Sequence, residues 1–113
     1  MEAIIEACLH GLGEMRISAV QWGEIAAVQR KRLGAQVQDR LLSSLMELQF
    51  RIVPATAERA VRAAAIRVDR KISNADSYAI ELAMDSPDHL LVTADYDFKA
   101  VTDLARIEFL PAK

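Results

Sequence analysis

The sequence predicts an α/β fold in which short parallel strands alternate with helices. Several segments carry apolar residues at helical spacing, and short apolar or β-branched runs separate them. The run from His89 to Thr93 is the clearest of these, and its composition is typical of a fully buried strand. Strands separated by helices favour packed layers with a parallel sheet and right-handed crossovers. At 113 residues the chain suffices for one core, so we predict a single domain over residues 1–113.

The first half of the chain is expected to hold three helices and two strands. Ser18 and Gln21 form a capping-box pair that predicts a helix start at Ala19, and Gly34 predicts its end. Pro54 stops the second strand. The expected helices are Glu2–Leu12, Ala19–Leu33 and Gln36–Leu48, and the expected strands are Arg16–Ser18 and Phe50–Val53.

The second half is expected to continue with two helices and two strands. Thr56 is the predicted cap of an alanine-rich helix that extends to about Arg70. The pair Ser73–Asn74 opens a further helix that reaches Met84, before Ser86 and Pro87 interrupt the chain. The remaining strands are His89–Thr93 and Ile107–Leu110.

Composition excludes several classes of protein. Apolar residues make up 52% of the chain and charged residues 27%, which argues against disorder. No apolar run is long enough to cross a bilayer, so no membrane association is expected. The lone Cys8 rules out an internal disulfide framework and a cysteine-based zinc site. Because the first residues are acidic rather than basic, they do not resemble a secretory signal, and a cytoplasmic location is expected.

Charge is distributed unevenly along the chain. Basic residues dominate from Arg51 to Lys71, and a further basic cluster, Arg30 to Arg32, closes the second predicted helix. Acids dominate from Ile72 to Asp103, where Lys99 is the one basic residue. A basic rim beside an acidic centre suits an enzyme that binds a polyanion and cuts it with a metal. Solvated helix faces and helix C-termini explain the same clusters equally well.

Three acids stand in apolar surroundings. Glu24 and Asp76 have apolar neighbours three and four positions away, so both carboxylates are expected to point toward the interior. Asp95 follows the predicted buried strand, at the sheet edge where parallel sheets place their sites. Buried carboxylates are tolerated mainly when they are paired or bind a metal. The three acids together therefore suggest a divalent-cation site.

Each acid also has a simpler interpretation. Glu24 can be a helix residue that pairs with a neighbouring arginine. Asp76 lies three residues after Ser73, where capping and the helix dipole favour an acid. Asp95 and Asp97 can be turn formers, since aspartate favours turns.

Three motifs resemble the PIN-domain ribonucleases, most closely the VapC-like toxins of bacterial toxin–antitoxin pairs. Order, spacing and flanking residue types agree over essentially the whole chain. The motifs are Ser18-Ala19-Val20-Gln21-Trp22-Gly23-Glu24, Ile72-Ser73-Asn74-Ala75-Asp76-Ser77-Tyr78-Ala79-Ile80 and Leu91-Val92-Thr93-Ala94-Asp95-Tyr96-Asp97-Phe98.

The resemblance implies a three-layer α/β/α domain with a short parallel sheet, whose acids bind Mg²⁺ or Mn²⁺ and hydrolyse RNA. It makes Glu24, Asp76 and Asp95 the catalytic and metal-binding acids, with Asp97 as an auxiliary metal ligand and Thr93 as an auxiliary hydroxyl residue. It also implies a cognate antitoxin partner and a homodimer.

One departure from the family pattern affects both fold and activity. The family begins with an apolar strand that carries a first aspartate, and nothing in this sequence matches it. Either the start of a longer enzyme is missing from residues 1–113, or the chain is a natural truncation without activity. The second explanation makes the protein a catalytically inactive PIN-like module that binds an antitoxin or itself, with Trp22, Leu41 and Leu45 as candidate contact residues.

Overall fold

The computed structural model describes residues 14–47, 50–93 and 95–111. The predicted helix Glu2–Leu12 lies outside the described residues. The chain divides into two compact units, Met1–Pro54 and Ala55–Lys113, so the single domain stays a prediction. Among the residues that the structure describes, none of the helices combines the length and the apolar character that crossing a lipid bilayer requires.

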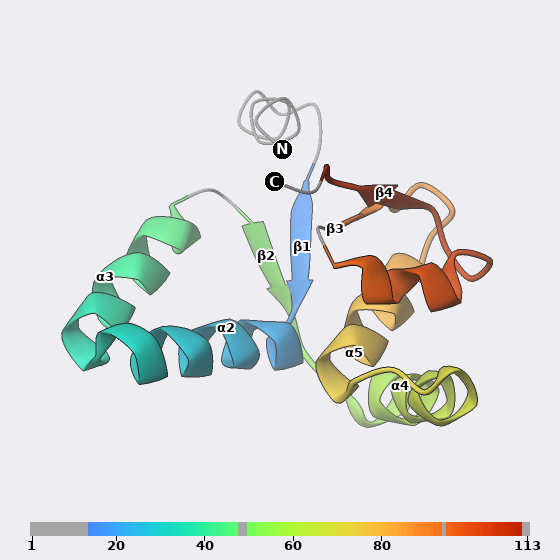
Figure 1. Ribbon diagram of the computed structural model, residues 1–113, viewed down its shortest axis with the longest axis horizontal. Coiled ribbons are helices and arrows are strands. Elements are labelled where there is room, and N and C mark those ends of the chain that lie inside the picture. The colour runs from blue at the N-terminus through green and yellow to red at the C-terminus, as the bar shows by residue number, and fades with distance from the viewer. Residues whose placement is uncertain (1–13, 48–49, 94, 112–113) are drawn as a thin grey trace. The chain divides into compact units, whose positions relative to one another are not determined.

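The first unit is a parallel strand pair linked through two helices (Figure 1). Strand β1 (Met15–Ser18) pairs in parallel with β2 (Phe50–Val53), and helices α2 (Ala19–Leu33) and α3 (Ala35–Met46) connect them. The Ser18 hydroxyl caps α2 by accepting a hydrogen bond from the Val20 N–H at 3.2 Å. Gly34 ends α2 with φ of 84°, a conformation that favours glycine and lets α3 begin at once.

The second unit contains two longer helices, a 3₁₀ helix and a second parallel strand pair. Helices α4 (Ala57–Arg70) and α5 (Asn74–Ala83) lie side by side (Figure 1). Strands β3 (Leu91–Thr93) and β4 (Ile107–Phe109) pair in parallel, and the 3₁₀ helix η1 (Tyr96–Val101) lies between them in the sequence. The core of this unit joins α5 to η1 through Ala79, Ile80, Phe98 and Val101.

The predicted α/β class with short parallel strands is confirmed. Every helix and strand expected within the described residues is present, with ends that differ by two residues or fewer. The 3₁₀ helix η1 was not predicted. The interpretation of His89–Thr93 as a fully buried strand is wrong, because β3 is half-buried along its length. Leu110, just beyond β4, donates its backbone N–H to the Thr93 carbonyl at 2.8 Å, so this edge of β3 is held by backbone pairing.

A buried glutamate joins α4 to α5. Glu81 is only 3% exposed, and both of its carboxylate oxygens accept hydrogen bonds from Arg59 Nη1 at 3.0 Å. Arg62 Nε donates to the same carboxylate at 2.9 Å, and Arg59 Nη2 donates to Asp85 at 2.9 Å. The Arg59 guanidinium lowers the pKa of Asp85. Because a buried charge is costly without partners, the two arginines make this position of α5 possible.

Replacing Arg59 with methionine is expected to lower the free energy of unfolding by about 3 kcal/mol, because Glu81 stays buried with less compensation. The control is Arg67→Met on the same helix, where a single hydrogen bond to Asn74 is lost. The double variant Arg59→Met/Glu81→Leu should recover part of the loss, since it removes the buried charge as well. Urea denaturation measures all three. Equal losses for Arg59→Met and Arg67→Met would contradict this role for Glu81.

Candidate metal centre

Asp76 is positioned by the start of α5. Ser73 caps this helix, and its hydroxyl accepts a hydrogen bond from the Asp76 N–H at 3.2 Å. Asp76 therefore lies in the first helical turn, as its simpler interpretation required. The side chain is half-buried, and its neighbours Ala79 and Ile80 are buried. Asp76 therefore fits both interpretations: it is an acid in the capped first turn of α5, and it lies on the apolar face of that helix.

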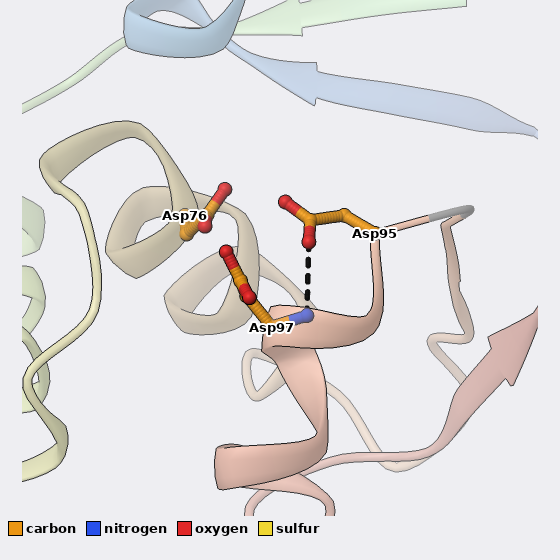
Figure 2. A group of neighbouring side chains, drawn as sticks. All are labelled: Asp76, Asp95 and Asp97. Atoms are coloured by element: carbon orange, nitrogen blue, oxygen red, sulfur yellow. Dashed lines mark hydrogen bonds between the residues drawn. The ribbon is translucent and has the colours of Figure 1, made fainter.

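Asp95 and Asp97 are positioned by hydrogen bonds that follow β3. The Thr93 hydroxyl accepts a hydrogen bond from the Asp95 N–H at 3.0 Å. Asp95 Oδ1 then accepts one from the Asp97 N–H at 2.9 Å, which caps η1 and appears as the dashed line in Figure 2. Asp95 is therefore a turn former, as one interpretation held, and the turn directs its carboxylate. Both aspartates are exposed, so the expectation of a buried Asp95 is wrong.

The structure brings three of the proposed site residues together. Asp76, Asp95 and Asp97 each offer a carboxylate oxygen within 4.8 Å of the other two. Figure 2 shows Asp76 on α5 facing the two aspartates at the start of η1. Carboxylate oxygens are hard ligands, and Mg²⁺ takes few of them because it keeps several waters. Three carboxylates in a partly exposed place leave room for those waters. Such a site therefore suits Mg²⁺ better than a closed cage of protein ligands would.

Glu24 belongs to the other unit. It lies on α2 and is exposed, and none of the described residues of α2 is buried. The expectation that Glu24 points into the interior is therefore wrong. Ala27 and Val28, which carried that expectation, are exposed as well. Apolar spacing shows which residues share a helix face, but it does not show that another element covers the face.

An ion pair that the sequence analysis did not anticipate holds the chain beyond η1 in place. Arg70 at the end of α4 donates two hydrogen bonds to Asp103, at 2.7 and 2.8 Å, and a third to the Ala100 carbonyl at 3.2 Å. The guanidinium lowers the pKa of Asp103. Two parallel charge-assisted bonds add directional restraint to the attraction. This contact holds the end of η1 against α4, and η1 carries Asp97.

A cavity of about 300 Å³ lies beside the acids, entirely within the second unit. Its lining combines two acids of the cluster with two basic side chains. The lining residues are Arg70, Lys71, Ile72, Ser73, Asp76, Asp97 and Ala100. Because opposite charges line one small cavity, the cavity suits a cation and an anionic group that bind side by side.

Comparison with known proteins gives one positive finding. A family model described as PIN domain matches residues 2–104, which is most of the chain. The search of curated proteins and the search of solved structures each found no match.

Acid is expected to weaken the Arg70–Asp103 contact. Because the pKa of Asp103 is lower in the folded chain than in the unfolded one, the contact stabilises the fold above about pH 4. That stability is lost as the pH falls through the folded-state pKa. Asp103→Asn should therefore lose less stability than the wild type between pH 6 and pH 2.

Urea midpoints measured at steps of pH test this, and Asp88→Asn is the matched control. The Asp88 side chain takes part in no ion pair among the described residues. Parallel pH profiles for the wild type and Asp103→Asn would show that the contact contributes nothing in solution.

Proposed function

Because this chain belongs to the PIN-domain family, whose members are generally nucleases, we propose that it is a metal-dependent endoribonuclease that hydrolyses RNA phosphodiester bonds. The observation that carries the proposal is the meeting of Asp76, Asp95 and Asp97 within 4.8 Å. These acids come from different elements of the second unit, and two of them were expected from the sequence as principal ligands.

The proposed ligands of Mg²⁺ or Mn²⁺ are Asp76, Asp95 and Asp97, with Glu24 as a further ligand from the first unit. A cation bound by these oxygens would supply an activated water and neutralise the charge that builds up on the phosphate. Hard divalent ions prefer carboxylate oxygen, which is the only kind of ligand in the three-acid group.

The remaining residues of the site position these acids. The Thr93 hydroxyl fixes the backbone of Asp95, and Asp95 Oδ1 fixes the backbone of Asp97. The Ser73 hydroxyl accepts the Asp76 N–H and so holds the first turn of α5 in place. Rigid placement of ligands before substrate arrives lowers the cost of reaching the reactive geometry. We therefore assign Thr93 and Ser73 as positioning residues, and no direct contact with RNA is proposed for them.

We further propose that the protein is the toxin of a toxin–antitoxin pair, with a cognate antitoxin and a homodimer as its assemblies. The three motifs in register with VapC-like toxins support this role. Exposed apolar side chains on α2 and α3 offer a surface for a protein partner, among them Leu33, Leu41 and Met46. Trp22 is less available for such contacts, because its ring packs against Phe50 at 5.4 Å.

The same exposed side chains favour one alternative, a catalytically inactive PIN-like module that binds a partner protein. Binding without chemistry needs these surfaces and does not need the acids. The response of the protein to divalent cations distinguishes the two functions, because only the nuclease needs a bound metal.

Asp95→Asn is expected to abolish divalent-dependent cleavage of a fluorescent single-stranded RNA library. The variant keeps the oxygen that caps η1, since asparagine caps as well as aspartate does, so the fold should survive. Millimolar Mn²⁺ should raise the melting temperature of the wild type, because a ligand present at a hundred times its Kd stabilises the folded state by about 2.7 kcal/mol. In Asp95→Asn the shift should be much smaller.

Asp88→Asn is the control, because Asp88 is an exposed acid outside the three-acid group. It should cleave and respond to Mn²⁺ as the wild type does. A folded wild-type chain that neither responds to Mn²⁺ nor cleaves RNA would favour the binding module. Cleavage that persists in Asp95→Asn would refute the proposed site.

Glu24→Gln tests the ligand proposed from the first unit. If Glu24 binds the metal, the variant should lose more than about tenfold in Mn²⁺ affinity and cleavage rate, since even groups that only support metal ligands are worth 10- to 100-fold. Glu47→Gln, at the exposed end of α3, is the matched control. Mn²⁺ titration followed by melting temperature gives the affinity. An unchanged Mn²⁺ affinity in Glu24→Gln would remove Glu24 from the site and leave the three aspartates.

A further inference from the structure

Two basic side chains, Arg70 and Lys71, line the cavity beside the acids, and they differ in whether they already have hydrogen-bond partners. Arg70 is committed to Asp103 and to the Ala100 carbonyl, so three of its hydrogen bonds already have acceptors. Lys71 is exposed, and none of the ion pairs or side-chain hydrogen bonds found among the described residues involves it. The charge of Lys71 is therefore the one that this cavity can offer to an incoming anion.

The backbone holds Lys71 at a defined place. It follows the last residue of α4 in the left-handed conformation, with φ of 56° and ψ of 45°. Two residues later, Ser73 caps α5. The short turn between two helices thus sets where the lysine stem leaves the chain, on the lining that also carries Asp76 and Asp97.

A phosphodiester chain matches this distribution of charge. Its phosphates repeat along the strand, so a phosphate at the acids brings a neighbouring phosphate close by. A cation bound by Asp76 and Asp97 would attract the first phosphate, and a free ammonium would attract the next. A protein or lipid ligand would not need a metal-binding cluster at the same cavity.

We propose that Lys71 binds an RNA phosphate next to the one that is cleaved, and so sets the register of the strand over the acids. This inference rests on the proposed nuclease function and adds a substrate-binding residue to it. Lysine binds phosphate as a point charge and reads no base, so the contact contributes to affinity without selecting a sequence.

The test is the salt dependence of RNA binding by the full chain. Fluorescence anisotropy of a labelled 12-nucleotide single-stranded RNA in EDTA measures binding without metal-dependent cleavage. Lys71→Asn removes the charge and keeps a residue that tolerates the left-handed conformation, so its stability should match the wild type. Loss of one phosphate contact should reduce the slope of log K against log salt by about 0.7. At 50 mM salt the Kd should rise about fivefold or more, and equally for unrelated RNA sequences.

Two further variants make the result specific. Arg106→Gln removes a positive charge from the same unit outside this cavity, and it should leave the slope unchanged. Lys71→Arg keeps the charge and should restore wild-type binding.

The outcomes separate this inference from the proposed function. If the wild type binds and cleaves RNA while Lys71→Asn keeps the full salt slope, the role of Lys71 is refuted and the nuclease stands. If Lys71→Asn loses slope but the wild type with Mn²⁺ cleaves nothing, Lys71 binds an RNA phosphate, but the nuclease is refuted, and so is the place of that phosphate next to a cleaved one. If the wild type neither binds nor cleaves RNA, both are refuted.

Discussion

Repulsion between like charges is the constraint around which the second unit is organised. Three carboxylates within 4.8 Å of one another would separate if their backbone were free to move. Several contacts prevent this: the Ser73 cap on α5, the hydrogen bonds from Thr93 through Asp95 to Asp97, and the Arg70–Asp103 pair that anchors η1. Each contact is charge-assisted or involves the backbone, so the acids are held by restraints that do not depend on a bound ion.

Asp95 serves the fold and the proposed chemistry with different atoms. One oxygen accepts the Asp97 N–H and caps η1. A carboxylate has two oxygens, so the other stays available to a cation. Such a double role explains why a turn former and a metal ligand need not be competing interpretations of one residue. In the same way, Asp76 combines a place in the first turn of α5, which Ser73 caps, with a place in the cluster.

Signals between residues close in the sequence were sufficient to predict the helices and strands. Contacts between residues on different helices and strands could not be predicted in this way. Ser18, Thr56 and Ser73 cap their helices as expected, because a cap depends on residues within one turn. Glu24 was misplaced because its burial depends on whether another element covers α2. Glu81 was missed because its partners, Arg59 and Arg62, lie on a different helix. The helix η1 was missed because Asp95 and Asp97 signal a turn equally well, and the packing of Phe98 and Val101 extends that turn.

The two strand pairs also differ in how the chain must come together to form them. Met15 meets Phe50 in the first unit, whereas Leu91 meets Ile107 in the second, so the first closure spans roughly twice as many residues. For a flexible loop, doubling the length adds only about 0.6 kcal/mol of entropy. The larger demand on the first pair is that α2 and α3 fold back on each other, as the 2.8 Å bond from Gln38 to the Ala26 carbonyl shows. We therefore expect the β1–β2 pair to assemble on a preformed helical hairpin, and β3–β4 to close around the six-residue 3₁₀ helix η1 with less prior order.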